Sequence, residues 1–182
     1  MTDVAPVRFV EPDKVLTHFH IREGETVADF GAGSGYFTPT LCEAVGSEGK
    51  VYACDIQKPL LEKIGVSAEK HNWTQVQVLW CDIDEPGGIK INDDEVEVGI
   101  LINTLFQLED KAAAMTEVLR TLHSGAKFYI IDWSESFNGL GPQVGDVVSK
   151  SEALVLAETA GFVFERDFPA GDHHYGLAFR KP

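Results

Sequence analysis

Long apolar runs, basic residues and cysteines are all scarce in this sequence. No stretch of about 18 apolar residues occurs, so we expect no transmembrane helix. Lys and Arg total 15 against 29 Asp and Glu, a net charge of −14, whereas nonspecific binding to nucleic acid or anionic membranes requires basic surface. Three cysteines without regular spacing do not suggest a disulfide framework. The first residues also lack the build of a signal peptide. The sequence therefore predicts a cytoplasmic protein that acts on a small molecule.

The length of 182 residues suits one domain, and 44% hydrophobic residues are enough for its core. We therefore predict a single domain over residues 1–182. Within it, residues 1–20 are expected to form a helical lead-in that includes a short helix over Pro12–His20. No internal repeat or low-complexity run interrupts the chain.

Short apolar runs alternate with amphipathic segments along the chain. Continuous apolar strands separated by helix-length segments are typical of a parallel sheet with helices on both faces. The sequence predicts strands at Glu25–Phe30, Lys50–Cys54, Val76–Trp80, Val96–Ile102, Lys127–Ile131, Phe162–Arg166 and Tyr175–Phe179.

The intervening segments carry the helical period. An apolar stripe at Leu108, Ala112, Met115, Val118 and Leu122 predicts one helix. Gly125 is expected at the C′ position that ends it. Further stripes predict helices around residues 37–45 and 61–68, with Pro39 in a first turn, and another helix over residues 151–160 that stops at Gly161.

Residues 134–150 differ from the rest of the chain. They contain three glycines and a proline without any helix or strand period. Long irregular segments in compact domains commonly act as lids or binding loops. We therefore predict a lid or substrate loop over residues 134–150.

The most informative motif is a glycine-rich turn between a strand and a helix. It reads VADFGAGSGY over residues 27–36, with Gly31, Gly33 and Gly35. Glycine permits positive φ and close approach of a ligand, and the following helix N-terminus offers unpaired N–H groups. A dinucleotide site would read G-x-G-x-x-G, which this spacing does not match.

Two acidic residues follow the next two strands. Asp55 comes directly after the second strand, where a carboxylate can accept hydrogen bonds from a ribose diol. Asp82 follows the third strand and can accept from an adenine amino group. Because the carboxyl ends of parallel strands meet at one edge, these acids and the glycine turn are expected to share a crevice.

Together these segments resemble the class I S-adenosylmethionine-dependent methyltransferases. The resemblance rests on VADFGAGSGYFT, VYACDIQ, CDID and the long run from ILINTLFQ to FYIIDW. It extends to small single-domain members of the branch that contains quinone-biosynthesis and arsenite methyltransferases. It implies an α/β, three-layer Rossmann-like fold with seven strands in the order 3-2-1-4-5-7-6, strand 7 being antiparallel. The implied cofactor is S-adenosyl-L-methionine, with S-adenosyl-L-homocysteine as product.

The resemblance also implies roles for individual residues. The methionine part of the cofactor would be held by the first-strand turn, the ribose by Asp55, and the adenine by the positions after the second and third strands. Asn103 would lie near the reacting methyl group. The implied cofactor-binding residues are Asp29, Gly31, Ala32, Gly33, Gly35, Asp55, Ile56, Asp82, Ile83 and Asn103.

Acceptor-side residues are proposed from their chemistry alone. The candidates for catalysis are Asp132, His173, His174 and Tyr175. A histidine titrates near neutral pH, and His174 could accept a proton from a phenol, enol or amine. An exposed turn is an equally plausible reading of this histidine pair. No metal is expected, because His18 and His20 have no third ligand nearby.

Three functions remain open. The first is transfer of a methyl group to a small-molecule acceptor by in-line displacement. The others are a non-catalytic protein that binds the same cofactor and a nicotinamide-dependent oxidoreductase. Phe106 and Gln107 stand where many members of the resembled family carry histidine, which sustains the non-catalytic alternative. A homodimer is also left open.

Overall fold

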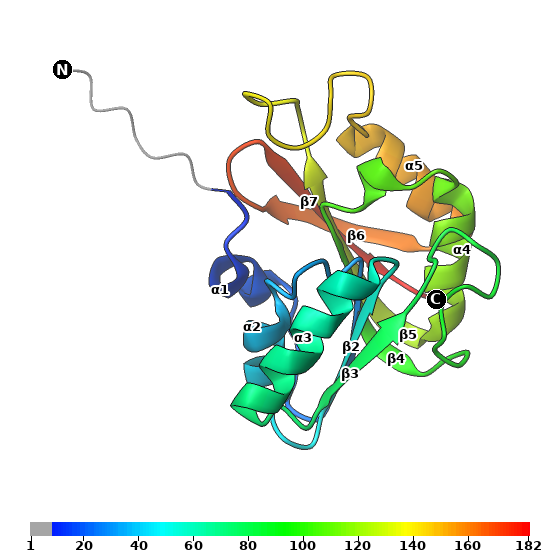
Figure 1. Ribbon diagram of the computed structural model, residues 1–182. Coiled ribbons are helices and arrows are strands. Elements are labelled where there is room, and N and C mark those ends of the chain that lie inside the picture. Colours follow the sequence, from blue (N-terminus) through cyan, green and yellow to red (C-terminus); the bar gives the residue numbers. More distant parts are fainter. Residues whose placement is uncertain (1–8) are drawn as a thin grey trace.

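Seven strands form one mixed sheet in the order β3-β2-β1-β4-β5-β7-β6 (Figure 1). The computed structural model describes residues 9–182, so part of the lead-in predicted for residues 1–20 lies outside the described residues. β1 to β5 pair in parallel, and β7 runs antiparallel to both β5 and β6. This topology confirms the predicted order and the antiparallel strand. The strands are β1 (Thr26–Phe30), β2 (Lys50–Asp55), β3 (Val76–Trp80), β4 (Val96–Ile102), β5 (Leu122–Trp133), β6 (Val163–Pro169) and β7 (His174–Arg180).

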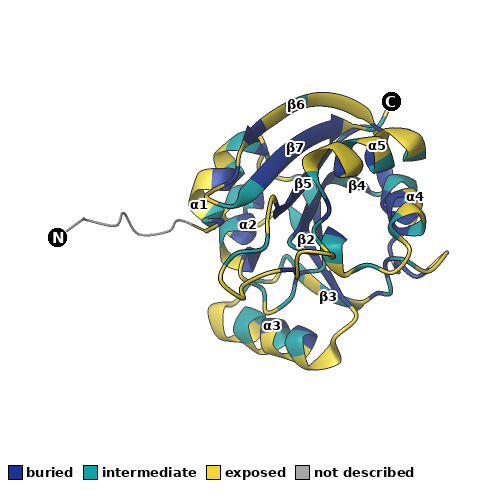
Figure 2. Ribbon diagram, turned by 90° about the horizontal axis from the view of Figure 1, so that it is seen from above, coloured by how far each residue is buried: buried dark blue, intermediate teal, exposed yellow. Residues whose placement is uncertain are grey.

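Helices cover both faces of the sheet, which gives three layers (Figures 1 and 2). α4 and α5 pack on one face, whereas α1, α2 and α3 pack on the other. The helices are α1 (Pro12–Val15), α2 (Thr38–Val45), α3 (Lys58–His71), α4 (Lys111–Thr121) and α5 (Lys150–Ala160), with 3₁₀ turns η1 (Leu16–His18) and η2 (Leu105–Gln107). Among the described residues, no helix combines the length and apolar composition needed to cross a membrane.

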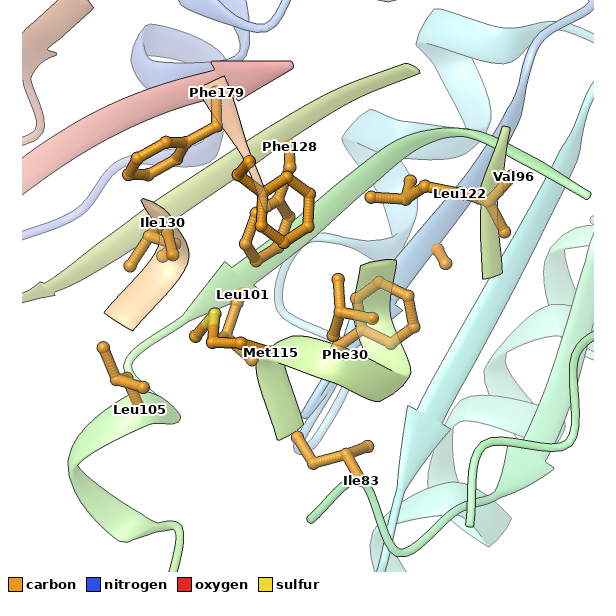
Figure 3. Close-up of a cluster of buried hydrophobic side chains, with 14 of the residues drawn as sticks. Phe30, Ile83, Val96, Leu101, Leu105, Met115, Leu122, Phe128, Ile130 and Phe179 are labelled. Carbon is orange, nitrogen blue, oxygen red and sulfur yellow. The ribbon is translucent and has the colours of Figure 1, made fainter. Parts of the chain in front are cut away.

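A large buried cluster lies where β1, β4 and β5 meet α4. Figure 3 shows Phe30, Leu101 and Phe128 from the sheet gathered around Met115 of α4, all fully buried. β7 is buried along most of its length, whereas the edge strand β6 is mostly exposed (Figure 2). The central strands therefore hold their carboxyl ends in fixed positions, and those ends carry the site.

Two details of α4 were predicted wrongly. Ala112 is exposed, and Ala114 takes the buried position of the stripe. The helix ends at Thr121 and runs directly into β5, so Gly125 lies within a strand rather than at C′. The stripe placed the helix on the correct face, but its two ends were set by contacts that the period does not encode.

α5 shows how local sequence fixes a helix start and stop. Ser149 and Glu152 form a reciprocal capping box at its first turn. Gly161 adopts φ +113° at the C-cap, as expected from the sequence. Residues 134–149 before this helix contain only an isolated bridge between Phe137 and Leu140, which agrees with the irregular segment predicted there.

Candidate active site

A cleft of about 660 Å³ opens at the carboxyl ends of β1, β2, β3 and β4. Its walls come from segments that are far apart in the sequence but follow neighbouring strands. The lining residues are Asp29, Gly31, Ala32, Gly33, Ser34, Tyr36, Phe37, Asp55, Ile56, Gln57, Cys81, Asp82, Ile83, Asp84, Glu85, Ile102, Asn103, Thr104, Gln107, Leu108, Glu109 and Asp110. The crevice predicted from the sequence was expected at this same edge of the sheet.

Two positions of the glycine-rich turn require glycine. Gly31 has φ +84°, and a Cβ there would lie 2.3 Å from Oγ1 of Thr104. Gly35 has φ +81° and would meet Ile64 of α3 at 2.8 Å. Both positions therefore combine a left-handed backbone with a close approach, so any side chain would displace the turn.

Asp29 is the penultimate residue of β1, two residues before Gly31, and its carboxyl group is buried. It is 3% exposed, and its Oδ2 has no hydrogen-bond partner. Burial, together with the charge of Asp55, raises the pKa of Asp29 to about 7. An unpartnered buried carboxylate that lines a cleft is suited to binding a cationic group such as an ammonium.

Asp55 organises the turn as well as facing the cleft. Its Oδ2 accepts from the backbone N–H of Gly33 at 2.8 Å, and its Oδ1 accepts from the N–H of Gln57 at 2.8 Å. Each carboxylate oxygen can accept two hydrogen bonds, so both retain capacity for a ligand such as a ribose diol. Sequence reasoning anticipated the second role and missed the first.

The outer wall of the cleft is acidic. Oδ2 of Asp84 accepts from the backbone N–H groups of Glu109 and Asp110, which ties the segment after β3 to the start of α4. Burial and the neighbouring Asp84 raise the pKa of Asp82. Of the described residues that line the cleft, seven are Asp or Glu and none is Lys, Arg or His. The cleft therefore favours a cationic ligand.

The end of β4 supplies the inner wall. Asn103 has φ +54°, and its Oδ1 is buried without a partner. Its backbone carbonyl accepts from Nε2 of Gln107 at 2.7 Å, and its N–H donates to the Ile131 carbonyl. Asparagine tolerates this left-handed backbone better than most residues. A residue that lines the cleft therefore keeps an unpartnered amide oxygen.

Asp132 and Tyr175 serve neighbouring backbone groups rather than lining the cleft. Asp132 accepts from the N–H groups of Trp133 at 2.7 Å and Phe106 at 3.3 Å. Burial raises the pKa of Asp132 to about 6, although these bonds oppose the shift. The Tyr175 hydroxyl donates to the Val148 carbonyl at 3.0 Å, and burial raises its pKa well above the usual range. Tyr175 thereby fixes the end of the 134–149 segment.

The two histidines have different surroundings. His173 pairs through Nδ1 with Glu135 at 2.7 Å and stacks on Phe137. In His174, Nδ1 lies 2.8 Å from the Asp172 carbonyl, so this nitrogen carries the proton and donates. Its Nε2 is then an acceptor, and it is buried without a partner. Burial lowers the pKa of His174, which favours the neutral form of the ring.

Nine of the ten residues predicted to bind the cofactor line the cleft, and Gly35 lies behind it against α3. The four predicted catalytic residues lie outside the lining, around the ends of β5 and β7. Sequence reasoning missed Thr104, whose side chain limits the space at Gly31. It also left Gln107 unassigned, which lines the cleft, whereas Phe106 faces a separate groove beside α5. The roles of all these residues stay predictions.

The methyltransferase domain family matches residues 21–161 of this chain. The match spans the glycine turn, both strand-end acids and the whole parallel part of the sheet. The chain belongs to the class I S-adenosylmethionine-dependent methyltransferases. The expected family, fold and cofactor are thereby confirmed.

Individual relatives agree with this assignment. The chain is 28% identical over 131 residues to the ubiquinone/menaquinone biosynthesis C-methyltransferase UbiE of Idiomarina loihiensis, covering 71% of this chain and 51% of that protein. It thus spans about half the length of this curated relative. The crystal structure of a SAM-dependent methyltransferase from Aquifex aeolicus superposes with a TM-score of 0.87 and 29% identity, covering 96% of this chain and 91% of that one.

A more distant structure shares only the fold. Geranyl diphosphate C-methyltransferase from Streptomyces coelicolor superposes with a TM-score of 0.78 at 12% identity, covering 94% of this chain and 78% of that one. That structure contains S-adenosyl-L-homocysteine, Mg²⁺ and geranyl diphosphate. The same scaffold therefore serves acceptors of quite different chemistry.

The cleft residues fit S-adenosylmethionine. The unpartnered Oδ2 of Asp29 suits its ammonium, and the remaining lone pairs of Asp55 suit its ribose hydroxyls. Ile56 and Ile83 give apolar walls on which an adenine ring can pack. The acidic lining also matches a molecule that carries both an ammonium and a sulfonium.

Proposed function

We propose that this methyltransferase transfers a methyl group from S-adenosylmethionine to the ring carbon of a small phenol or hydroquinone. When bound, the cofactor supplies an electrophilic methyl carbon on a positive sulfonium. The choice of cofactor rests on the cleft, in which Oδ2 of Asp29 has no partner. The choice of acceptor is supported by the C-methyltransferases among the relatives and by the aromatic residues at the ends of β5 and β7.

The chain's own residues would act by orientation and by holding a proton. Alignment of two reacting groups can lower a barrier by roughly 7–11 kcal/mol. His174 offers a neutral ring with a fixed tautomer and a free Nε2 beside Trp133. A phenol whose hydroxyl donates to this nitrogen becomes more electron-rich at its ring carbons as the proton moves. Once the methyl group has joined a ring carbon, loss of the proton on that carbon restores the aromatic ring. His174 is thus our candidate general base.

The 134–150 segment would complete the acceptor site. It is anchored at its ends, through Tyr175 to Val148 and through His173 to Glu135. Gly141 lies against the Trp133 ring so closely that a Cβ would come within 2.4 Å. We propose that this segment covers the acceptor and excludes water from it.

The test combines binding with a labelled-methyl transfer screen. Calorimetry with S-adenosylhomocysteine should show binding to the wild type and strongly reduced binding to Asp55→Asn, with the exposed Glu62→Gln on α3 as control. The screen should then label phenols or hydroquinones in preference to amines and thiols, with the label on carbon. Binding without transfer to any acceptor would favour the non-catalytic alternative. Absence of binding would overturn the proposal.

A further inference from the structure

Two of the three cysteines lie together at the cofactor cleft. Cys54 is the penultimate residue of β2, and Cys81 follows β3. Both are buried in the same apolar cluster on the α4 side of the sheet. The N–H of Cys81 donates to the carbonyl of Asp55 at 3.1 Å, which places Cys81 beside the residue next to Cys54. Their thiols share a hydrogen bond.

The two thiols differ in their readiness to ionise. The hydrogen bond from Cys54 lowers the pKa of Cys81, assisted by the backbone N–H and the charge of Lys90. The same bond and burial raise the pKa of Cys54. Cys81 is therefore placed as the nucleophile and Cys54 as the thiol that resolves it.

Access and charge select what can reach Cys81. It lines the cleft, whereas Cys54 does not, so reagents approach from the cofactor side. The seven carboxylates of the lining repel anions such as glutathione disulfide. A small uncharged oxidant such as hydrogen peroxide meets no such barrier.

We propose that Cys54 and Cys81 form an oxidation site within the cofactor cleft. The Cys81 thiolate attacks hydrogen peroxide, which leaves a sulfenic acid on Cys81 and releases hydroxide. The Cys54 thiol then attacks the sulfenic sulfur, a disulfide forms, and its proton leaves with the hydroxyl group as water. One peroxide is reduced for each pair of thiols oxidised.

The chemistry of this site does not depend on the proposed function, but its consequence does. Cys54 directly precedes Asp55, and Cys81 directly precedes Asp82. A disulfide draws the two Cα atoms to within about 4.4–6.8 Å. Both acids proposed to hold adenosine would move with them. We therefore expect the oxidised protein to bind S-adenosylhomocysteine at least about tenfold more weakly, and reduction with dithiothreitol to restore binding.

Cys42 provides an internal control. It lies in α2 on the opposite face, and burial raises its pKa to about 11. The full chain is treated with hydrogen peroxide and mapped by peptide mass spectrometry. We expect a linked Cys54–Cys81 peptide to form at least about ten times faster than any product at Cys42. Glutathione disulfide at the same concentration should give far less of it.

Variants separate the two steps. Cys54→Ala keeps an apolar side chain in the core, and it should let dimedone trap a sulfenic acid at Cys81. Cys81→Ala should abolish both products, and Cys42→Ala should change neither; melting curves verify that each variant folds. The proposal is overturned if Cys42 oxidises first, or if the wild type accumulates Cys81 sulfenic acid without the disulfide. A fast disulfide that leaves the affinity for S-adenosylhomocysteine unchanged would count against the proposed roles of Asp55 and Asp82 only.

Discussion

The two halves of the sheet's carboxyl edge are built in opposite ways. At β1, β2 and β3 the edge is acidic and hollow, and it leaves Oδ2 of Asp29 without a partner. At β5 and β7 it is aromatic, and most of its polar side chains are bound to backbone groups. The first half thus presents polar groups with which a cationic ligand can pair. The second resembles a support that positions one free nitrogen, Nε2 of His174.

We call the edge at β1, β2 and β3 the cofactor half, and the edge at β5 and β7 the acceptor half. The cofactor half should determine affinity for the cofactor, and the acceptor half should determine turnover. The halves meet at the end of β4 and at η2, and we expect substitutions in one half to leave the measure of the other unchanged. Four variants can break that separation, and they differ in the size of the effect expected.

The largest effect is expected for Gly31→Ala. Its methyl group would lie 2.3 Å from Thr104 at φ +84°. Overpacking and backbone strain together cost about 2–4 kcal/mol, so affinity for S-adenosylhomocysteine should fall by about a hundredfold. Gly24→Ala is the matched control, since it has φ +87° and open space around its Cβ. Equal losses in both variants by calorimetry would contradict the close-approach argument.

The next effect concerns turnover. His174→Gln removes the free ring nitrogen, so kcat for a phenolic acceptor should fall by about a hundredfold. Calorimetry should show unchanged affinity for S-adenosylhomocysteine. His123→Gln, at the opposite end of β5, controls for loss of a histidine. A His174 variant that loses cofactor affinity as much as turnover would refute the division of labour.

A smaller effect is expected on the pH dependence of stability. The pKa of Asp29 in the folded protein is about 7, above its usual value of 3.8. Between these values the folded state binds more protons than the unfolded state, so stability falls as pH rises and levels off above pH 7. Asp29→Asn removes this slope. Relative to wild type, it should gain about 2 kcal/mol between pH 5 and pH 8 in chemical unfolding. An unchanged slope would mean that Asp29 is ionised throughout.

The smallest effect is expected for Glu135→Gln in the acceptor half. Glu135 is 60% exposed, so its pair with His173 contributes at most about 1 kcal/mol. Global stability and cofactor affinity should hardly change. Hydrogen exchange in residues 134–150 should nevertheless quicken, because one anchor of the segment is lost. Identical exchange in both proteins would show that the pair does not hold the segment.

The same contrast explains how much the sequence revealed. The cofactor half follows from local signals, since a glycine turn after a strand and acids after the next two must meet at one edge. The acceptor half depends on contacts between segments far apart in the sequence, such as those of His173 with Glu135 and of Tyr175 with Val148, and no local pattern encodes those. The hydrogen bond from Gly33 to Asp55 and the close approach of Gly31 to Thr104 also join residues far apart in the sequence, so only the structure reveals them.

The ends of helices and strands were likewise predictable only where local sequence sets them. Val76–Trp80 and Val96–Ile102 were predicted to the residue, because apolar runs bounded by polar turns define them. β5 extends well beyond the predicted Lys127–Ile131, since Leu122, directly after α4, already pairs with Val96 of β4. Gly125 was misplaced for that reason. Periodicity identifies an element, whereas tertiary pairing decides where it ends.

A crystal structure of the complex with S-adenosylhomocysteine would decide how the cleft binds the cofactor. We expect the ribose hydroxyls on Asp55, the adenine edge at Asp82 and Ile83, and the ammonium on Oδ2 of Asp29. A ligand bound instead in the groove beside α5, or adenosine contacts that bypass both strand-end acids, would contradict this expectation.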